Sequence, residues 1–224
     1  MPKKAGAIFV ILGAVLILSA LLLFLYNKRE DRNAGQEAEL TLVQIQSSIQ
    51  SAKQETTPKP TDATEETEAS EATEETTEPT ESTEPTEPLS PEMPKVVING
   101  NEYIGYLSIP DLELELPVMA DWTYAKLQVS PCRQFGSSRT DDLVIAAHNY
   151  ASHFGTLKDL KEGAQITFTD MDGIVVTYAL TSLQTIAPTN IDAVQFSGHD
   201  LVLYTCTPGG AYRVTAFFDR VTED

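Results

Sequence analysis

A cysteine and an arginine stand at facing ends of two strand-like runs near the end of the chain. Residues 201–206 and 213–218 are rich in β-branched and aromatic residues, and six residues with a Pro-Gly-Gly turn signal join them. If the runs pair as an antiparallel hairpin, Cys206 and Arg213 are the closing pair, with Cβ atoms about 4.5–5.5 Å apart. A guanidinium beside a thiol favours the nucleophilic thiolate and offers donors to an oxyanion. The pair therefore predicts acyl-transfer chemistry at Cys206.

Transfer of an acyl group between amines also requires a residue that gives and takes a proton, and histidine is the usual one. The chain has three histidines. His148 follows the apolar run 143–147 and begins a loop, where a rigid strand can hold its side chain in a site. His153 and His199 lie in polar, turn-like stretches and are expected to be exposed loop residues. His148 is therefore the candidate acid and base.

The elements that must position these groups are mostly short strands. The predicted strands are residues 103–109, 112–118, 143–147, 165–170, 174–183, 201–206 and 213–221, and short helical patterns cover 122–129 and 154–160. Many short strands with turn signals at close spacing favour a closed or nearly closed β-barrel over a layered α/β domain.

Period-two alternation divides the last hairpin into two faces. The nearly apolar face predicted to point into the barrel holds Leu201, Leu203, Thr205, Val214, Ala216 and Phe218. The mixed face predicted to line a groove holds Val202, Tyr204, Cys206, Arg213, Thr215 and Phe217. The cysteine and the arginine therefore belong to the groove face.

Several runs share their order and their reacting residues with one enzyme family. They are Gly-Tyr-Leu-Ser-Ile-Pro at 105–110, Val-Ile-Ala-Ala-His-Asn at 144–149, Phe-Gly-Thr-Leu at 154–157, Leu-Tyr-Thr-Cys-Thr-Pro at 203–208, and Arg213. This set resembles the signature of the sortases, the membrane-anchored cysteine transpeptidases of Gram-positive bacteria. The resemblance extends over residues 102–221 and implies a mainly β, sortase-type barrel of about eight strands with short helices. Ala147 and Val202 depart from the usual Gly and Thr, and the subclass stays open.

The resemblance implies a role for each candidate residue. Cys206 attacks the carbonyl of a sorting-signal peptide bond and forms a thioacyl enzyme. His148 protonates the departing amine and later accepts a proton from the incoming one. Arg213 binds substrate and stabilises the oxyanion, while Thr205 either supports oxyanion or substrate or is an ordinary strand residue. No cofactor and no metal are expected.

The order of these residues differs from that of two other cysteine enzyme classes. An L,D-transpeptidase places its Arg two positions after its Cys, and a papain-like hydrolase places its Cys before its His, so neither order is present. A catalytically silent β-barrel binding module displayed on a stalk remains the alternative, and the reactivity of the Cys206 thiol discriminates it. Cys132 is expected to be a free or half-buried thiol in a loop.

The start of the chain carries a predicted membrane anchor. Residues 5–26 hold no charge, and a helix of that length spans roughly 33 Å against a hydrocarbon layer of about 30 Å. A cleaved signal peptide is the competing reading, but the apolar run is too long and lacks a small-x-small site after Phe24. Basic residues flank both ends of the span, so charge does not orient it. The resemblance implies a single-pass protein of the cell membrane with a cytoplasmic N-terminus and an extracellular catalytic domain.

Two segments are predicted between the anchor and the barrel, so the expected division is 1–28 for tip and anchor, 29–50 for a juxtamembrane helix, 51–94 for a linker and 95–224 for the sortase catalytic domain. Ala38, Leu42, Ile45 and Ile49 recur at helical spacing in the second segment, which is interpreted as a solvated stalk or a weak self-association face.

The linker is rich in Thr, Glu and Pro, with 13 acidic and 2 basic residues out of a net charge of −18 for the chain. Such a composition predicts disorder, and an extended segment of this length could hold a domain roughly 100 Å from the bilayer. No clustered Lys and Arg supply a nucleic-acid site, so nucleic acid is excluded as a partner. The partners implied by the resemblance are secreted proteins that bear a sorting signal and an amine acceptor on peptidoglycan or a pilin.

Overall fold

The computed structural model describes residues 3–55 and 89–222, and the second range is mostly strand. The strands are β1 (Val96–Ile98), β2 (Asn101–Ile109), β3 (Leu114–Met119), β4 (Cys132–Phe135), β5 (Leu143–Ala146), β6 (Gln165–Asp170), β7 (Val175–Ile186), β8 (Leu201–Cys206) and β9 (Arg213–Arg220). The helical elements are α1 (Lys3–Glu55), α2 (Tyr124–Leu127) and α3 (Asp192–Gln195), with the 3-10 turns η1 (Pro110–Leu112) and η2 (Leu157–Asp159).

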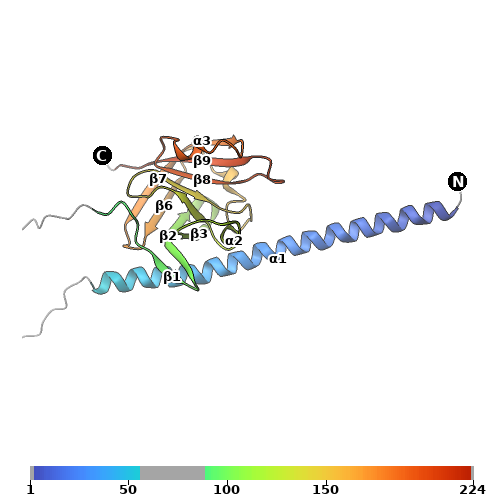
Figure 1. Ribbon diagram of the computed structural model, residues 1–224, viewed down its shortest axis with the longest axis horizontal. Helices are drawn as coiled ribbons and strands as arrows, with labels where there is room; N and C mark the ends of the chain where they lie inside the picture. The colour runs from blue at the N-terminus through green and yellow to red at the C-terminus, as the bar shows by residue number, and fades with distance from the viewer. Residues whose placement is uncertain (1–2, 56–88, 223–224) are drawn as a thin grey trace, which may run out of the picture.

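Eight of these strands close into a barrel. Neighbouring strands follow the order β2-β3-β4-β5-β8-β9-β7-β6, and β6 pairs again with β2 to complete the ring. The short β1 lies outside the ring and pairs with the start of β2. The predicted closed barrel of about eight strands is therefore confirmed, and Figure 1 shows it packed against one end of the long helix α1.

One face of the last hairpin points its side chains into the barrel, as the period-two alternation predicted. Leu201, Leu203, Ala216 and Phe218 are fully buried in the main core, together with Phe154, Phe168 and Tyr178. Thr205 is also buried, and Val214 packs on the edge of the same core. The apolar face of β8 and β9 is thus the barrel interior.

The opposite face of this hairpin is a groove only at its open end. Val202 and Phe217 are buried in a second cluster with Val194 of α3, and Thr215 between the strands is fully buried. The expectation that all six side chains of this face line a groove is therefore wrong. The reason is that α3 and the end of β7 cover the middle of the hairpin.

The helix α1 has two halves with different surroundings. Residues 8–26 are apolar and almost wholly exposed, and α1 contains a segment long and apolar enough to cross a membrane. In its second half Ala38, Leu42, Ile45 and Ile49 are buried. Ala38 packs on the main core, and the two isoleucines belong to a cluster with residues of β1, β2, β3 and β4.

The interpretation of this apolar face as a solvated stalk is therefore wrong, because the face packs on the barrel. One continuous helix leads from the apolar half to the barrel, as Figure 1 shows. The barrel is consequently not held about 100 Å from the end of the predicted span.

Both ends of the described chain around the predicted linker lie on the barrel. Residues 51–55 continue α1, and Lys53 donates a hydrogen bond from Nζ to the carbonyl of Gly173 at 3.3 Å. On the other side Met93 is buried and accepts a hydrogen bond from the hydroxyl of Ser138. The disorder predicted for residues 51–94 is therefore wrong for 51–55, which are helical, and residues 56–88 lie outside the described residues.

Candidate active site

The β8–β9 hairpin places Cys206 directly opposite Arg213. The register pairs Cys206 with Arg213 and Thr205 with Val214, so the predicted closing pair is confirmed. Both side chains are half-buried. The guanidinium of Arg213 donates from Nη1 to the carbonyls of Gly210 and Tyr212, each at 3.1 Å, and these bonds hold it at the mouth of the hairpin.

His148 reaches the same edge of the barrel through the parallel pairing of β5 with β8. Ala146 lies opposite Tyr204, and the N–H of Ala147 donates to the carbonyl of Tyr204 at 3.1 Å. The pairing ends there, two residues before His148 on one side and two residues before Cys206 on the other. Neighbouring strands lie about 4.8 Å apart. Cys206 and His148 therefore both lie at the carboxyl ends of two paired strands, β8 and β5.

Thr205 fixes this junction from inside the barrel. Its hydroxyl donates to the carbonyl of Ala147 at 2.9 Å, and the side chain is buried. This hydroxyl therefore restrains the residue that precedes His148.

A cleft of about 250 Å³ opens beside the thiol and the guanidinium. Its wall is largely apolar and comes from α2, the end of β7 and the β7–β8 connection. The lining includes Leu127, Ile186, Pro188, Ile191, Val194 and Tyr204. Cys206 and Arg213 both line this cleft, so a carbonyl seated here would face the nucleophile and its cationic neighbour.

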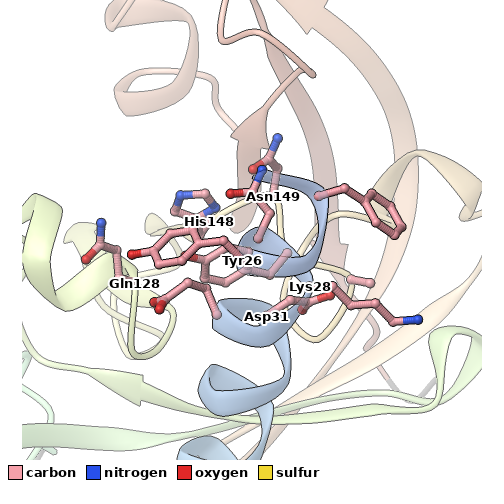
Figure 2. A pocket seen from close by; sticks show the side chains of 11 residues that line it. Tyr26, Lys28, Asp31, Gln128, His148 and Asn149 are labelled. Atoms are coloured by element: carbon pink, nitrogen blue, oxygen red, sulfur yellow. The ribbon is translucent and has the colours of Figure 1, made fainter. Parts of the chain in front are cut away.

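His148 lines a different cavity, of about 600 Å³, on the α1 side of the barrel. Figure 2 shows His148 and Asn149 facing Tyr26 and Asp31 of α1 across this space. Ala147, the residue before His148, lines the smaller cleft. Ala147 therefore borders the Cys206 cleft, while His148 itself borders the α1 cavity.

The ring of His148 is held by stacking and by burial. It lies parallel to the ring of Tyr150, with centroids 4.0 Å apart and an interplanar angle of 16°. Its Nδ1 is buried and has no hydrogen-bond partner within the described residues. Burial lowers the pKa of His148 below its usual value, and the side chains of Asn149 and Asp31 partly oppose that effect.

A family comparison covers the part of the chain that holds these residues. The sortase domain model matches residues 107–221, which is about half of the chain and contains all four candidate residues. The chain belongs to the sortase family. No match is found among curated proteins.

Solved sortase structures are similar to this chain over the barrel. Sortase A from Corynebacterium diphtheriae is 22% identical, with a TM-score of 0.49 over 55% of this chain and 63% of that one, so less than two thirds of its length is matched. Sortase C1 from Streptococcus suis is 26% identical, with a TM-score of 0.49 over 55% of this chain and 74% of that one. Sortase C of Clostridium perfringens, solved with the C-terminal cell wall sorting motif, is 20% identical, with a TM-score of 0.48 over 55% and 72%.

The other two histidines of this sortase, both expected to be exposed in loops, differ in their burial. His153 is completely buried, and neither ring nitrogen has a hydrogen-bond partner among the described residues. The expectation of an exposed loop histidine is therefore wrong for His153. Burial, followed by the neighbouring His148, lowers the pKa of His153 to about 4. His199 is partly exposed and lies 2.7 Å from Asp219 through Nδ1.

The second cysteine, Cys132, is not a candidate nucleophile. Cys132 is a free, fully buried thiol whose pKa burial raises to about 12. It lies in β4, opposite Met119 and Ala146, and not in the loop that its neighbours suggested. A thiol with a raised pKa is a poor nucleophile. The described residues contain no cluster of His, Cys, Asp or Glu that could hold a metal ion.

Two features of the site have no obvious signature in the sequence. Tyr150 stacks on the candidate acid and base, and Asp31 contacts the same loop from α1, 121 residues away from its partner Ser152. Tyr150 follows His148 by two positions, so its proximity could have been suspected. The contact of Asp31 depends on the docking of α1, which no local pattern specifies.

Proposed function

We propose that this chain is a membrane-anchored cysteine transpeptidase that cleaves a C-terminal sorting signal and transfers the acyl group to an amine. One observation carries the proposal. Cys206 lies directly opposite Arg213 in one strand pair, and the loop that begins with His148 follows β5, which pairs with the cysteine strand β8. A nucleophile, a proton carrier and an oxyanion donor are the groups that acyl transfer requires.

The first half-reaction uses all three groups. The thiolate of Cys206 attacks the scissile carbonyl carbon, a sulfur–carbon bond forms, and the carbonyl electrons move to oxygen. Arg213 donates hydrogen bonds to that oxyanion. When the oxyanion collapses, the carbon–nitrogen bond breaks and imidazolium His148 gives its proton to the departing amine. The product is a thioester on Cys206 and a neutral His148.

The second half-reaction reverses these roles. An acceptor amine attacks the thioester carbon while His148 removes the amine proton. The carbon–sulfur bond breaks, and the thiolate of Cys206 leaves with its electron pair. A new amide and the starting pair of thiolate and imidazolium result. Because burial lowers the pKa of His148, the imidazolium is the minor form at neutral pH, so donor cleavage is slowed at alkaline pH.

The shape of the cleft fits a peptide that carries an apolar side chain near its scissile bond. Its walls are mostly apolar, with polar groups at the Cys206 end, at Asn190 and at Gln134, which accepts a hydrogen bond from Tyr204. Few, well-placed polar groups in an apolar cleft orient a ligand. The proposed donors are secreted proteins with such a signal, and the proposed acceptors are amines of peptidoglycan or of a pilin.

The proposed localisation is the cell membrane, with one span at residues 5–26, the N-terminus in the cytoplasm and the barrel outside. Asp31 lies five residues beyond Tyr26, which is about 7.5 Å along a helix. Since Asp31 contacts the loop after His148, the active site would lie at the membrane surface.

A turnover assay tests the proposal. The full chain in detergent micelles is incubated with a panel of sorting-signal peptides and several amine acceptors, and the ligated product is followed by mass. We expect product formation with at least one pair, and none from Cys206→Ala, while Cys132→Ala retains activity. Turnover that survives in Cys206→Ala would overturn the assignment.

A further inference from the structure

The helix α1 touches the loop that carries His148 through one concentrated polar contact. Asp31 accepts a hydrogen bond at Oδ1 from the backbone N–H of Ser152 at 3.0 Å. The hydroxyl of Ser152 lies 2.6 Å from the same Oδ1 and 2.9 Å from the backbone carbonyl of Asp31. A charged acceptor strengthens such bonds. Both polar hydrogens of Ser152 are therefore directed to one residue of α1.

Small residues in the next turn of α1 allow this loop to lie close to the helix. A Cβ added at Gly35 would lie 3.0 Å from Cβ of Ser152. Ala34 and Ala38 on the same side of the helix are small and buried. Any larger side chain at position 35 would push the loop away from the helix, so the close contact is built into the sequence of α1.

The loop transmits this contact to the imidazole over a short distance. The N–H groups of His153 and Gly155 both donate to the carbonyl of Tyr150, at 3.0 and 2.8 Å, and the N–H of Phe154 donates to the carbonyl of His148. The Tyr150 ring in turn stacks on the His148 ring. The turn fixed by Ser152 therefore sets where the ring of Tyr150 stands against His148.

The charge of Asp31 also supports the proposed role of His148 as a proton donor. The negative charge of Asp31 raises the pKa of His148 against the effect of burial. Tyr26, Lys28 and Glu30 of α1 line the same cavity, and His153 and Tyr150 lie beside the ring on its own loop. Asp31 therefore favours the imidazolium that the proposed first half-reaction needs.

We propose that Asp31 of α1 is a positioning residue for His148, acting through Ser152 and Tyr150, so that the helix leading from the membrane completes the active site. The proposal rests on the proposed acid and base role of His148. It assigns α1 a part in catalysis beyond anchoring the barrel.

Variants that separate geometry from charge test this proposal in the full chain in micelles. Asp31→Ala removes the acceptor and the charge, and Asp31→Asn keeps a carbonyl acceptor for Ser152 without the charge. The matched control is Glu39→Gln, an exposed carboxylate on the same helix. Steady-state rates with a cleaved donor peptide are measured across pH, together with amide hydrogen exchange of residues 149–155.

We expect Asp31→Ala to lower kcat about 10- to 100-fold, with KM for the donor changed less than about threefold, because a displaced catalytic group costs this much. Asp31→Asn should recover most of kcat, yet in both variants the alkaline limb of the pH profile should move to lower pH. Exchange of residues 149–155 should accelerate in Asp31→Ala and stay unchanged in Glu39→Gln.

Two results would overturn the role of Asp31: kcat of Asp31→Ala within about twofold of the control, or unchanged exchange of the loop in that variant. An equal loss of rate in Asp31→Asn and Asp31→Ala with no movement of the pH limb would mark a merely structural residue. A wild-type chain that turns over no donor would instead overturn the proposed function, and the exchange data would still judge the contact between Asp31 and the loop.

Discussion

The buried hydroxyl of Thr205 donates a hydrogen bond to the carbonyl of Ala147, across the parallel pair β8 and β5. Thr205 immediately precedes the candidate nucleophile, and Ala147 immediately precedes the candidate acid and base. One hydrogen bond therefore ties together the two backbone positions from which Cys206 and His148 project. We infer that Thr205 supports the site by fixing this junction, and its support of oxyanion or substrate in the cleft that it lines stays a prediction.

Thr205→Val should weaken both the fold and the rate. The substitution leaves the carbonyl of Ala147 without this donor, which costs about 1–3 kcal/mol of unfolding free energy for a buried group. Thr205→Ser retains the hydroxyl and should restore most of the rate. Urea unfolding and donor turnover of the two variants check this, and a Thr205→Val chain with wild-type rate would show that the junction needs no such bond.

Arg213→Lys should reduce donor cleavage by about 100-fold, because an ammonium cannot reproduce the planar fork that Arg213 places beside Cys206. The matched control is Arg220→Lys at the far end of the same strand, where Arg220 contacts Asp141 and Ser138. This control should stay near the wild-type rate. Equal rates for Arg213→Lys and wild type in a peptide cleavage assay would make Arg213 a surface charge.

His153 should make the fold sensitive to acid. Its pKa falls to about 4 in the folded chain from an ordinary 6.5, so the unfolded chain binds more protons between these values. The stabilisation from His153 is complete above pH 6.5 and is lost as pH falls toward 4, by up to roughly 3 kcal/mol.

His153→Phe removes this titration, so its unfolding free energy should fall less than that of the wild type between pH 7.5 and pH 4.5. His199→Gln, at a partly exposed position, is the control and should behave like the wild type. Urea titrations at the two pH values provide the measurement. Identical acid losses for His153→Phe and wild type would mean that His153 is charged or solvated in the folded chain.

The docking of α1 on the barrel should contribute measurably to stability. Ile45 is fully buried against the barrel, and truncation of such a side chain to alanine costs about 2–5 kcal/mol. Val43, exposed on the same helix, provides the control Val43→Ala. Trp122, the single tryptophan of the chain, reports barrel unfolding in urea. If Ile45→Ala and Val43→Ala unfold at the same urea concentration, α1 does not pack on the barrel in solution.

The turn made the register of the last hairpin predictable. A Pro-Gly-Gly turn joins residues 201–206 and 213–218, so the Cys206–Arg213 pair followed from spacing, whereas the burial of Val202 and Phe217 under α3 did not. The short strands β1 and β4 were missed because three or four residues carry too little pattern. These two strands form because they pair with neighbouring strands, which their own short sequences do not show.

The surroundings of His148 could be predicted only in part. Its place at the end of β5 follows from the apolar run before it, but the contact of its loop with α1 depends on a helix more than 100 residues away. The amphipathic face of that helix predicts that another element packs on it but does not identify that element. For the same reason the burial of His153 could not be read from its polar neighbours.

The most direct test of the central claim is the intact mass of the full chain after reaction with a cleaved donor peptide in the absence of an acceptor amine. A thioacyl enzyme predicts a mass increase equal to the acyl fragment. Peptide mapping should place it on Cys206 and not on Cys132, and hydroxylamine should remove it. A chain that cleaves the donor without ever carrying this adduct, or that carries it on another residue, would contradict the account.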